Sequence, residues 1–199
     1  MRYLAVPLLT TTLALLAISP AHAASTPTKE QIQTAIDTAM EAAMAKSSSG
    51  VPPMPARITS LVSCRPSQEK PEEVACLVGM SAGMRDGYTV LPLRLDGANW
   101  VGVERKGAQF PAPTPAEAQA AMRAAAEQMV AANPDMAKDK EVQITRTTLQ
   151  VKTIKDCEVE RKSGHFQCST TLSIPEQKDI NTELKFAVDG AGWKFLPRK

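Results

Sequence analysis

The residues of this chain that most clearly suggest a chemistry are its four cysteines, Cys64, Cys76, Cys157 and Cys168. They form two pairs, each about a dozen positions apart, and neither has the two-residue gap of a zinc or thioredoxin-type motif. An even number of cysteines in an exported protein favours disulfides over metal or nucleophile roles. Of the three possible pairings, only Cys64–Cys76 with Cys157–Cys168 fits two equivalent folding units. Each such bridge contributes about 3 kcal/mol by restricting the unfolded chain.

Histidine and serine offer little further chemistry. Of the two histidines, His22 lies in an N-terminal signal sequence, which leaves His165. Ser163 is two positions away in the same loop, and groups so close in a loop rarely reach the geometry of a catalytic triad. A single histidine also cannot form a histidine-based metal site.

The carboxylates do not suggest a catalytic pair either. Glu72 and Glu73 are adjacent, so they point to opposite sides of an extended chain. Glu158 and Glu160 share one face of a predicted strand but stand among basic residues, which is typical of a solvated ion-pair surface. The sequence lacks a nucleophile elbow, a phosphate-binding loop and a dinucleotide fingerprint. We therefore expect no enzymatic activity, no metal and no cofactor.

Residues 1–23 have the pattern of a secretory signal peptide. Arg2 provides the basic start, residues 4–18 are an apolar run with a few Thr, and Ala21-His22-Ala23 has the small-x-small form of a cleavage site. The run is too short for a good membrane span, although a retained anchor is the alternative. No cysteine follows the run, so lipid attachment is excluded. We expect an unlipidated periplasmic protein, cleaved after Ala23 and not held at the membrane.

The composition excludes several classes of partner. Lys and Arg number 23 and Asp and Glu 21, a net charge of +2, and Arg2 leaves with the signal. The exported chain is therefore nearly neutral and has no basic excess to attract nucleic acid or anionic lipid. Aromatic residues make up only 4 % of the chain, which argues against a carbohydrate platform of stacked rings.

The exported part contains an internal repeat. The two cysteines and the Asp-Gly-x-x-Trp motif at 96–100 recur at an offset of about 93 residues, the second motif lying at 189–193. A helix signal precedes each set. We therefore predict a first α+β unit at 24–105, a Pro-rich linker at 106–113 and a second α+β unit at 114–199.

Each unit opens with a capped helix. Thr28 and Gln31 form the first capping box, and Thr114, Pro115 and Glu117 form the second, stronger start. The chain at 47–53 and Asn133-Pro134 end the helices. The apolar stripes are Ile32, Ile36, Met40 and Met44 in the first helix and Ala118, Met122, Ala126, Met129 and Val130 in the second.

Strand patterns follow each helix. The predicted strands are 57–64, 74–80, 88–95 and 100–104 in the first unit, and 142–157, 166–174, 184–188 and 193–196 in the second. Asp96-Gly97 and Asp189-Gly190 predict type I′ turns. The predicted fold class is α+β: two tandem repeats, each one helix plus an antiparallel meander of about four strands, in the element order of cystatin-like and NTF2-like folds.

The remaining chemistry is that of binding, because the loops near the disulfides are strongly polar. Closing a polar loop at its base lowers the entropy cost of binding with it. The alternative is that these loops are solvated and serve stability alone. The candidate partner-binding residues are Arg65, Glu69, Lys70, Glu72 and Glu73 in the first loop, and Glu158, Glu160, Arg161, Lys162 and His165 in the second.

The repeated Cys…Cys…Asp-Gly-x-x-Trp pattern, in an exported chain without a catalytic set, resembles the periplasmic immunity proteins that inhibit type IV secretion effectors. The resemblance implies a monomeric inhibitor that binds and neutralises a cell-wall-degrading toxin by protein–protein contact. Two other classes stay open. One is a binding module for a small apolar ligand, with Met40, Met44, Met122 and Met129 lining a concave sheet. The other is an envelope or secretion accessory protein.

Overall fold

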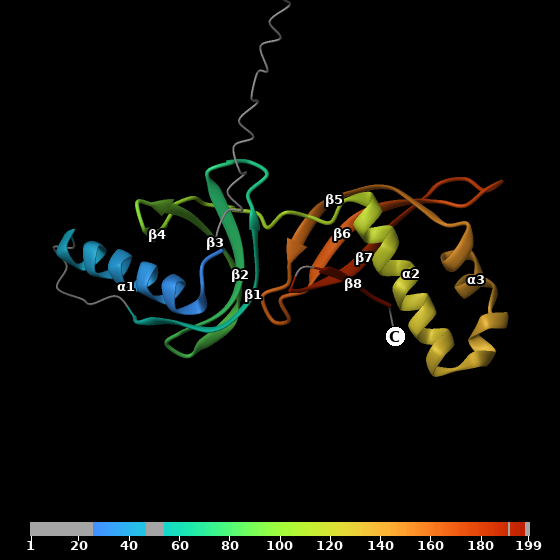
Figure 1. Cartoon of the computed structure of the whole chain (residues 1–199), viewed down its shortest axis with the longest axis horizontal. Helices are drawn as coiled ribbons and strands as arrows, with labels where there is room; N and C mark the ends of the chain where they lie inside the picture. Colours follow the sequence, from blue (N-terminus) through green and yellow to red (C-terminus); the bar gives the residue numbers. More distant parts are fainter. Residues whose placement is uncertain (1–25, 47–53, 191, 198–199) are drawn as a thin grey trace, which may run out of the picture.

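The computed structural model describes residues 26–46, 54–190 and 192–197. The predicted signal peptide and the predicted end of the first helix at 47–53 lie outside these residues. The described part contains three α-helices and two four-stranded antiparallel sheets, so the α+β class is confirmed. Figure 1 shows these elements as two helix-and-sheet halves, side by side along the long axis of the molecule.

In the first half, one helix packs on a four-stranded meander. The strands are hydrogen-bonded in chain order, with every neighbouring pair antiparallel, so the first and fourth strands form the edges. The elements are α1 (Lys29–Lys46), β1 (Ala56–Pro66), β2 (Glu73–Ala82), β3 (Arg85–Asp96) and β4 (Asn99–Gly102).

The second half has the same order of strands, and along the chain two short helices follow its long helix before the first strand of its sheet. The sheet is again an antiparallel meander in chain order. The elements are α2 (Pro115–Ala132), the 3-10 helix η1 (Pro134–Lys138), α3 (Lys140–Thr147), β5 (Gln150–Val159), β6 (Phe166–Ser173), β7 (Ile180–Asp189) and β8 (Gly192–Leu196).

Helix α3 corrects the predicted strand at 142–157, of which only the part from Gln150 onward is extended. The β-branched residues of this segment favour a strand by propensity alone. The Asp139 side chain instead accepts hydrogen bonds from the amides of Glu141 and Val142, at 2.9 and 3.1 Å. This N-cap starts a helix, and the burial of Val142 holds it in place.

Both long helices are capped as predicted. In α1 the Thr28 hydroxyl accepts from the Gln31 amide, and the Gln31 side chain accepts from the Thr28 amide at 2.9 Å. In α2 Thr114 and Glu117 form the same reciprocal pair, and Asn133 caps the end. These contacts satisfy backbone donors that the first turn of a helix leaves unpaired.

A glutamine fastens each long helix to the first strand of its sheet. Gln33 donates to the Ala56 carbonyl at 3.0 Å and accepts from the Ile58 amide at 2.7 Å. Gln119 makes the same two bonds, to the carbonyl of Leu149 and the amide of Val151, both at 2.7 Å. One amide side chain thus replaces two hydrogen bonds at the edge of each sheet.

Both predicted disulfides are confirmed. Cys64 and Cys76 are directly opposite each other on β1 and β2. Cys157 and Cys168 join β5 to β6 where the ladder is interrupted between Lys155 and Glu158. Each bridge therefore closes a hairpin close to its loop, as the spacing predicted.

The predicted turn type between β3 and β4 is wrong. Asp96 pairs with Asn99, so Gly97 and Ala98 are the two loop residues. A type I′ turn needs positive φ at both, but only Gly97 has it, at 61°. This pattern fits a type II′ turn, in which glycine occupies the first central position.

The two halves share a core because β2 is buried on both faces. One face of the first sheet packs on α1 through residues such as Ile32, Val78 and Trp100. The other face contributes Ala75 and Leu77 to the core of the second half. In Figure 1 the first sheet accordingly lies between α1 and the second half.

The β5–β6 loop also holds the halves together. The Tyr88 amide on β3 donates to the Arg161 carbonyl at 2.7 Å, and the Tyr88 ring lies against Gly164. Nearby, the Ser63 hydroxyl donates to the Gly190 carbonyl at 2.9 Å. We call these contacts, together with Ala75 and Leu77 on the second core, the joint.

Loss of either disulfide should destabilise the protein substantially. Replacing Cys157 and Cys168 together by Ser should lower the free energy of unfolding by about 2–4 kcal/mol, because the reduced chain gains loop freedom when unfolded. Urea unfolding checks this, with the reduced wild type as reference. Equal stability of the variant and the oxidised wild type would contradict it.

Gly164 should tolerate no side chain. A Cβ at this position would lie 2.7 Å from a Tyr88 ring carbon, and φ is +71°. Gly164→Ala should therefore cost about 3 kcal/mol, from backbone strain and overpacking together. Gly97→Ala is the matched control, because φ is +61° there and a Cβ meets nothing within 4 Å. Equal losses in urea unfolding would show that contact with Tyr88 is unimportant.

Candidate functional site

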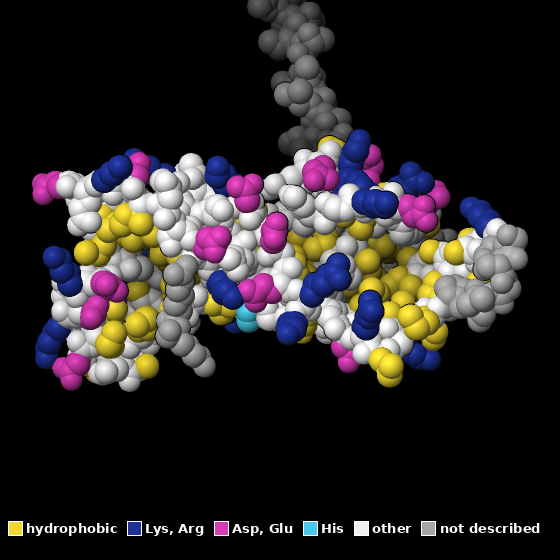
Figure 2. All heavy atoms as spheres, turned by 180° about the vertical axis from the view of Figure 1, so that it is seen from behind, with side chains coloured by type: hydrophobic (Ala, Val, Ile, Leu, Met, Phe, Trp, Pro, Cys, Tyr) yellow, Lys and Arg dark blue, Asp and Glu magenta, His cyan; other side chains and the backbone are white. Residues whose placement is uncertain are grey.

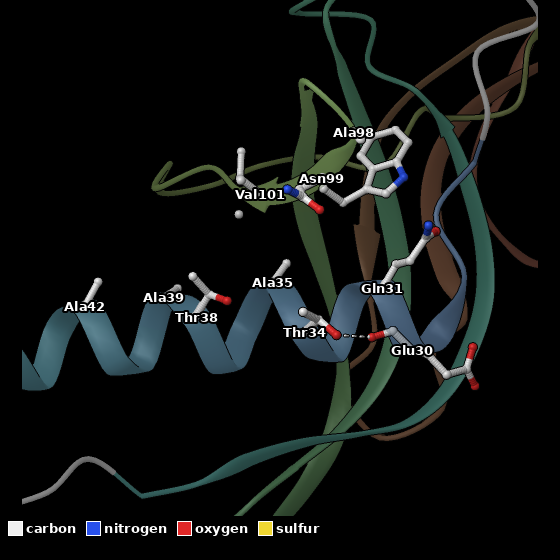
Figure 3. Close-up of a pocket in the computed structure, with 12 residues that line it drawn as sticks. Glu30, Gln31, Thr34, Ala35, Thr38, Ala39, Ala42, Ala98, Asn99 and Val101 are labelled. Carbon is white, nitrogen blue, oxygen red and sulfur yellow. Dashed lines mark hydrogen bonds between the residues drawn. The ribbon is translucent and has the colours of Figure 1, made fainter.

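A cleft of about 710 Å³ separates α1 from β4. Figure 3 shows its two walls facing each other, and Figure 2 shows hydrophobic side chains gathered on this half, at the right of that view. The α1 wall consists of Glu30, Gln31, Thr34, Ala35, Thr38, Ala39 and Ala42. The β4 wall consists of Ala98, Asn99, Trp100, Val101 and Gly102.

The cleft exists because both walls carry small side chains. Ala35, Ala39 and Ala42 face β4 from successive turns of α1. On β4, Trp100 and Gly102 are two positions apart and therefore share a face. Trp100 is buried and forms the floor, whereas Gly102 leaves open space beside it.

The corresponding strand of the second half is bulkier. Trp193 is the second residue of β8, as Trp100 is of β4, but the residue two positions later is Phe195. The Phe195 ring packs against Phe186, with the centroids 5.8 Å apart. The position that is open at Gly102 in the first half is thus occupied by a phenylalanine ring in the second.

The chemistry of the cleft is that of binding. Among the described residues that line it, only Glu30 is ionisable, and its pKa is lowered by a backbone amide of the helix start and by Thr28. The Thr34 hydroxyl donates to the Glu30 carbonyl at 3.0 Å, drawn as a dashed line in Figure 3. Within the described residues, the side chains of Thr38 and Asn99 form no hydrogen bond. They can therefore bond an occupant at the rim of an otherwise apolar floor.

The predicted methionine lining is wrong. None of Met40, Met44, Met122 and Met129 borders the cleft. Met122 is buried in the second core, and Met44 and Met129 are 43 % and 37 % exposed. The alanine and threonine positions 35, 38, 39 and 42 were the available signal, because their spacing also marks one face of a helix.

The first disulfide loop is less free than the sequence indicated. Arg65 belongs to the joint: it pairs with Glu117 at 3.2 Å and stands 5.1 Å over the Trp193 ring. The prediction that Glu73 lies on the surface is wrong, since it is buried beside Arg105. The carboxylate and guanidinium approach to 3.0 Å without hydrogen-bond alignment.

The other residues of that loop divide into two groups. Glu69 also contacts Arg105, at 3.2 Å, and remains half exposed. Lys70 and Glu72 are exposed. The structure therefore leaves only the tip of the loop open to a partner, because buried Glu73 and partly buried Arg105 fix its base.

The second disulfide loop serves mainly as part of the joint. The Arg161 carbonyl bonds the first half, while its side chain and those of Glu158 and Lys162 are exposed. Glu160 pairs with Lys185, and this contact with a hydrogen bond from Ser163 lowers the Glu160 pKa. The predicted residues of this loop are therefore divided between the joint, an ion pair and solvent-exposed positions.

Ser163 and His165 do not form a catalytic pair. The Ser163 hydroxyl donates to Glu160 at 2.9 Å and accepts from the backbone amide of His165 at 3.2 Å. The hydroxyl is thus used to shape the turn. Within the described residues, no group of three or more His, Cys, Asp or Glu is placed to hold a metal ion.

No helix in the described part is long and apolar enough to cross a membrane. Comparison of the chain with protein-family models, with curated proteins and with solved structures found no match.

The Arg65–Glu117 pair should make the joint sensitive to acid. Burial alone raises the pKa of Glu117. Hydrogen bonds from the Thr114 amide and hydroxyl and from Arg65 lower the pKa by more than burial raises it, so the net shift is downward. A lowered pKa in the folded state means that the charged form stabilises the fold above the ordinary pKa. That stabilisation disappears as the pH falls through the folded-state pKa.

Glu117→Gln keeps a side-chain acceptor for the capping box but removes the charge. Wild type should therefore be more stable than Glu117→Gln at pH 7, and the difference should shrink as the pH approaches 3. Urea unfolding at several pH values measures it. In a double-mutant cycle, adding Arg65→Gln to Glu117→Gln should cost less than Arg65→Gln alone. If the difference in unfolding free energy between wild type and Glu117→Gln does not change with pH, the Glu117 charge does not stabilise the fold.

Proposed function

We propose that this chain is a periplasmic inhibitor of the immunity-protein type, which binds and neutralises a cell-wall-degrading toxin by protein–protein contact. The observation that supports this best is the α1–β4 cleft, a hollow with little charge on a disulfide-bonded scaffold. Sites held by packed elements bind with a smaller entropy cost than mobile loops. The inhibitor needs no reaction of its own, which agrees with a cleft lined by a single ionisable residue.

The structure changes where the partner is expected to bind. The predicted loop residues are divided between the joint, which includes the Arg65–Glu117 pair, and the contacts that Arg105 makes with Glu69 and Glu73. The first half instead presents an apolar floor beneath Thr38 and Asn99. We therefore assign the main contact to the cleft and a secondary contact to the exposed tips at Glu72 and at Arg161 and Lys162.

The two halves are, we infer, tandem copies of one folding unit, at 24–105 and 114–199 with the linker at 106–113. The glutamine contacts of Gln33 and Gln119 support this beyond the cysteine and tryptophan pattern, because they join equivalent elements by the same two bonds. The sequence separation between the helix starts Thr28 and Thr114 is smaller than the separation between equivalent cysteines of the two units. The segment holding η1 and α3 accounts for the difference. The cystatin-like or NTF2-like element order belongs to this proposal.

Export through the signal at 1–23, with cleavage after Ala23, is the second part of the proposal. Two disulfides and no free cysteine in the described part support an oxidising compartment. The periplasm is the compartment in which a wall-degrading toxin would act.

A small apolar ligand is the second candidate occupant. A volume of about 710 Å³ lies within the usual range of about 300–1,000 Å³ for ligand sites. The buried Trp100 ring gives such a ligand an apolar floor. This reading replaces inhibition if purified protein carries a small molecule in native mass spectrometry.

An inhibition assay tests the proposal. The purified protein should form a one-to-one complex with one member of a panel of secreted wall hydrolases and abolish its degradation of peptidoglycan. Gly102→Phe should weaken this inhibition at least tenfold, because the added ring occupies the cleft. Arg94→Phe adds the same ring to an exposed position of β3 outside the cleft and should leave inhibition unchanged.

Charge reversal separates the cleft from the loops. Glu72→Lys, and Arg161→Glu with Lys162→Glu, should each reduce inhibition less than Gly102→Phe does. The cleft assignment is wrong if either loop variant abolishes inhibition while Gly102→Phe retains it. The inhibitor function itself is wrong if the wild type inhibits none of the hydrolases.

A further inference from the structure

The outer edge of β4 has unused backbone hydrogen-bonding groups. Asp96 and Asn99 flank a two-residue turn and form a hydrogen-bonded pair, so pairing alternates from there along the strand. Val101 thus bonds β3, and the Val103 amide donates to the Pro92 carbonyl at 3.0 Å. The backbone groups of Trp100 and Gly102 point the other way, to the side where the described part has no further strand.

Helix α1 is longer than the sheet beneath it. Its buried residues, Ile32 and Ala35, lie in its first half. Every residue from Glu41 to Lys46 is exposed, and Met44 is 43 % exposed. In Figure 3 Ala39 and Ala42 lie along this outer part of α1, on the side of the cleft. A strand added beside β4 would cover this part of the helix.

The side chain that fits the cleft is indicated by the other half of the chain. A Cβ on Gly102 meets no atom within 4 Å, whereas β8 fills the corresponding place with Phe195 against Phe186. In an added antiparallel strand, the residue opposite Gly102 points its side chain to the same face. That side chain therefore enters the space beside Trp100.

We propose that an extended segment of the partner adds to β4 as a fifth strand and places an aromatic or large aliphatic side chain in the cleft beside Gly102. The segment is uncharged where it enters, because Glu30 is the one charged residue among the described residues of the lining. Main-chain bonds to Trp100 and Gly102 supply affinity, and the apolar side chain supplies specificity. This inference rests on the proposed function, since it describes how the toxin is held.

Selection from a library of random 12-residue peptides tests the inference without knowledge of the partner. Peptides selected on the wild-type protein should alternate polar residues with bulky apolar ones. They should bind Gly102→Phe at least tenfold more weakly than wild type, and Arg94→Phe as well as wild type. Gly102→Ala adds only a methyl group and should have a smaller effect than Gly102→Phe.

Amide hydrogen exchange locates the bound peptide. Binding should slow exchange at the Trp100 and Gly102 amides at least tenfold and leave Val101, already bonded to β3, unchanged. A selected peptide N-methylated at its central residues should lose this protection. The inference is overturned if no peptide is enriched, if Gly102→Phe binds the peptides equally well, or if protection appears on another surface.

The outcomes separate this inference from the proposed function. If the Gly102→Phe variant still inhibits a wall hydrolase, the strand-addition inference is wrong and the proposed inhibitor function stands. If peptides protect the Trp100 and Gly102 amides but the protein inhibits no hydrolase, strand addition is supported and the proposed inhibitor function is wrong.

Discussion

Strand β2 has two apolar faces, and the chain covers them with different parts of itself. Helix α1 covers the face that contains Val78, and the second half covers the face that contains Ala75 and Leu77. Neither half can therefore be described as a separate folded body with its own solvated sheet. In the second sheet the counterpart of β2 is β6, which has only one buried face, with Phe166, Cys168, Thr170 and Leu172 alternating with less buried residues. The other face of β6 carries the polar residues Gln167, Ser169, Thr171 and Ser173.

The joint determines which surfaces remain available for function. The Arg161 carbonyl, Gly164 and Arg65 all contribute to it. These groups lie in or next to the polar disulfide loops that the sequence predicted to bind a partner. Loops near a disulfide are rigid and polar whether they meet a partner or another part of the same chain. Helix α1 lies on the side of the first sheet that faces away from the second half (Figure 1), so the joint does not cover the α1–β4 cleft, and Gly102 adds no side chain to fill it.

Much of the local structure could be predicted from short-range chemistry. The caps at Thr28 and Thr114, the end at Asn133 and both disulfides follow from residues close in sequence. The α3 segment could not be predicted in this way. Its β-branched residues favour a strand, and the bonds from Asp139 and the burial of Val142 outweighed that preference. The candidate site was also missed, because small residues on a helix do not distinguish a tightly packed face from an open one.

The sequence by itself determined the α+β class, the starts of the two long helices, the strand order of hairpins and the pairing of cysteines, since each depends on neighbours within about a dozen residues. Only the tertiary structure decided that Glu73 is buried beside Arg105, that Arg65 stands over Trp193, and that the cleft lies beside Gly102. These features join residues far apart in the chain. Their geometry is set by how two sheets and two helices fill space together, and the order of residues does not record that packing.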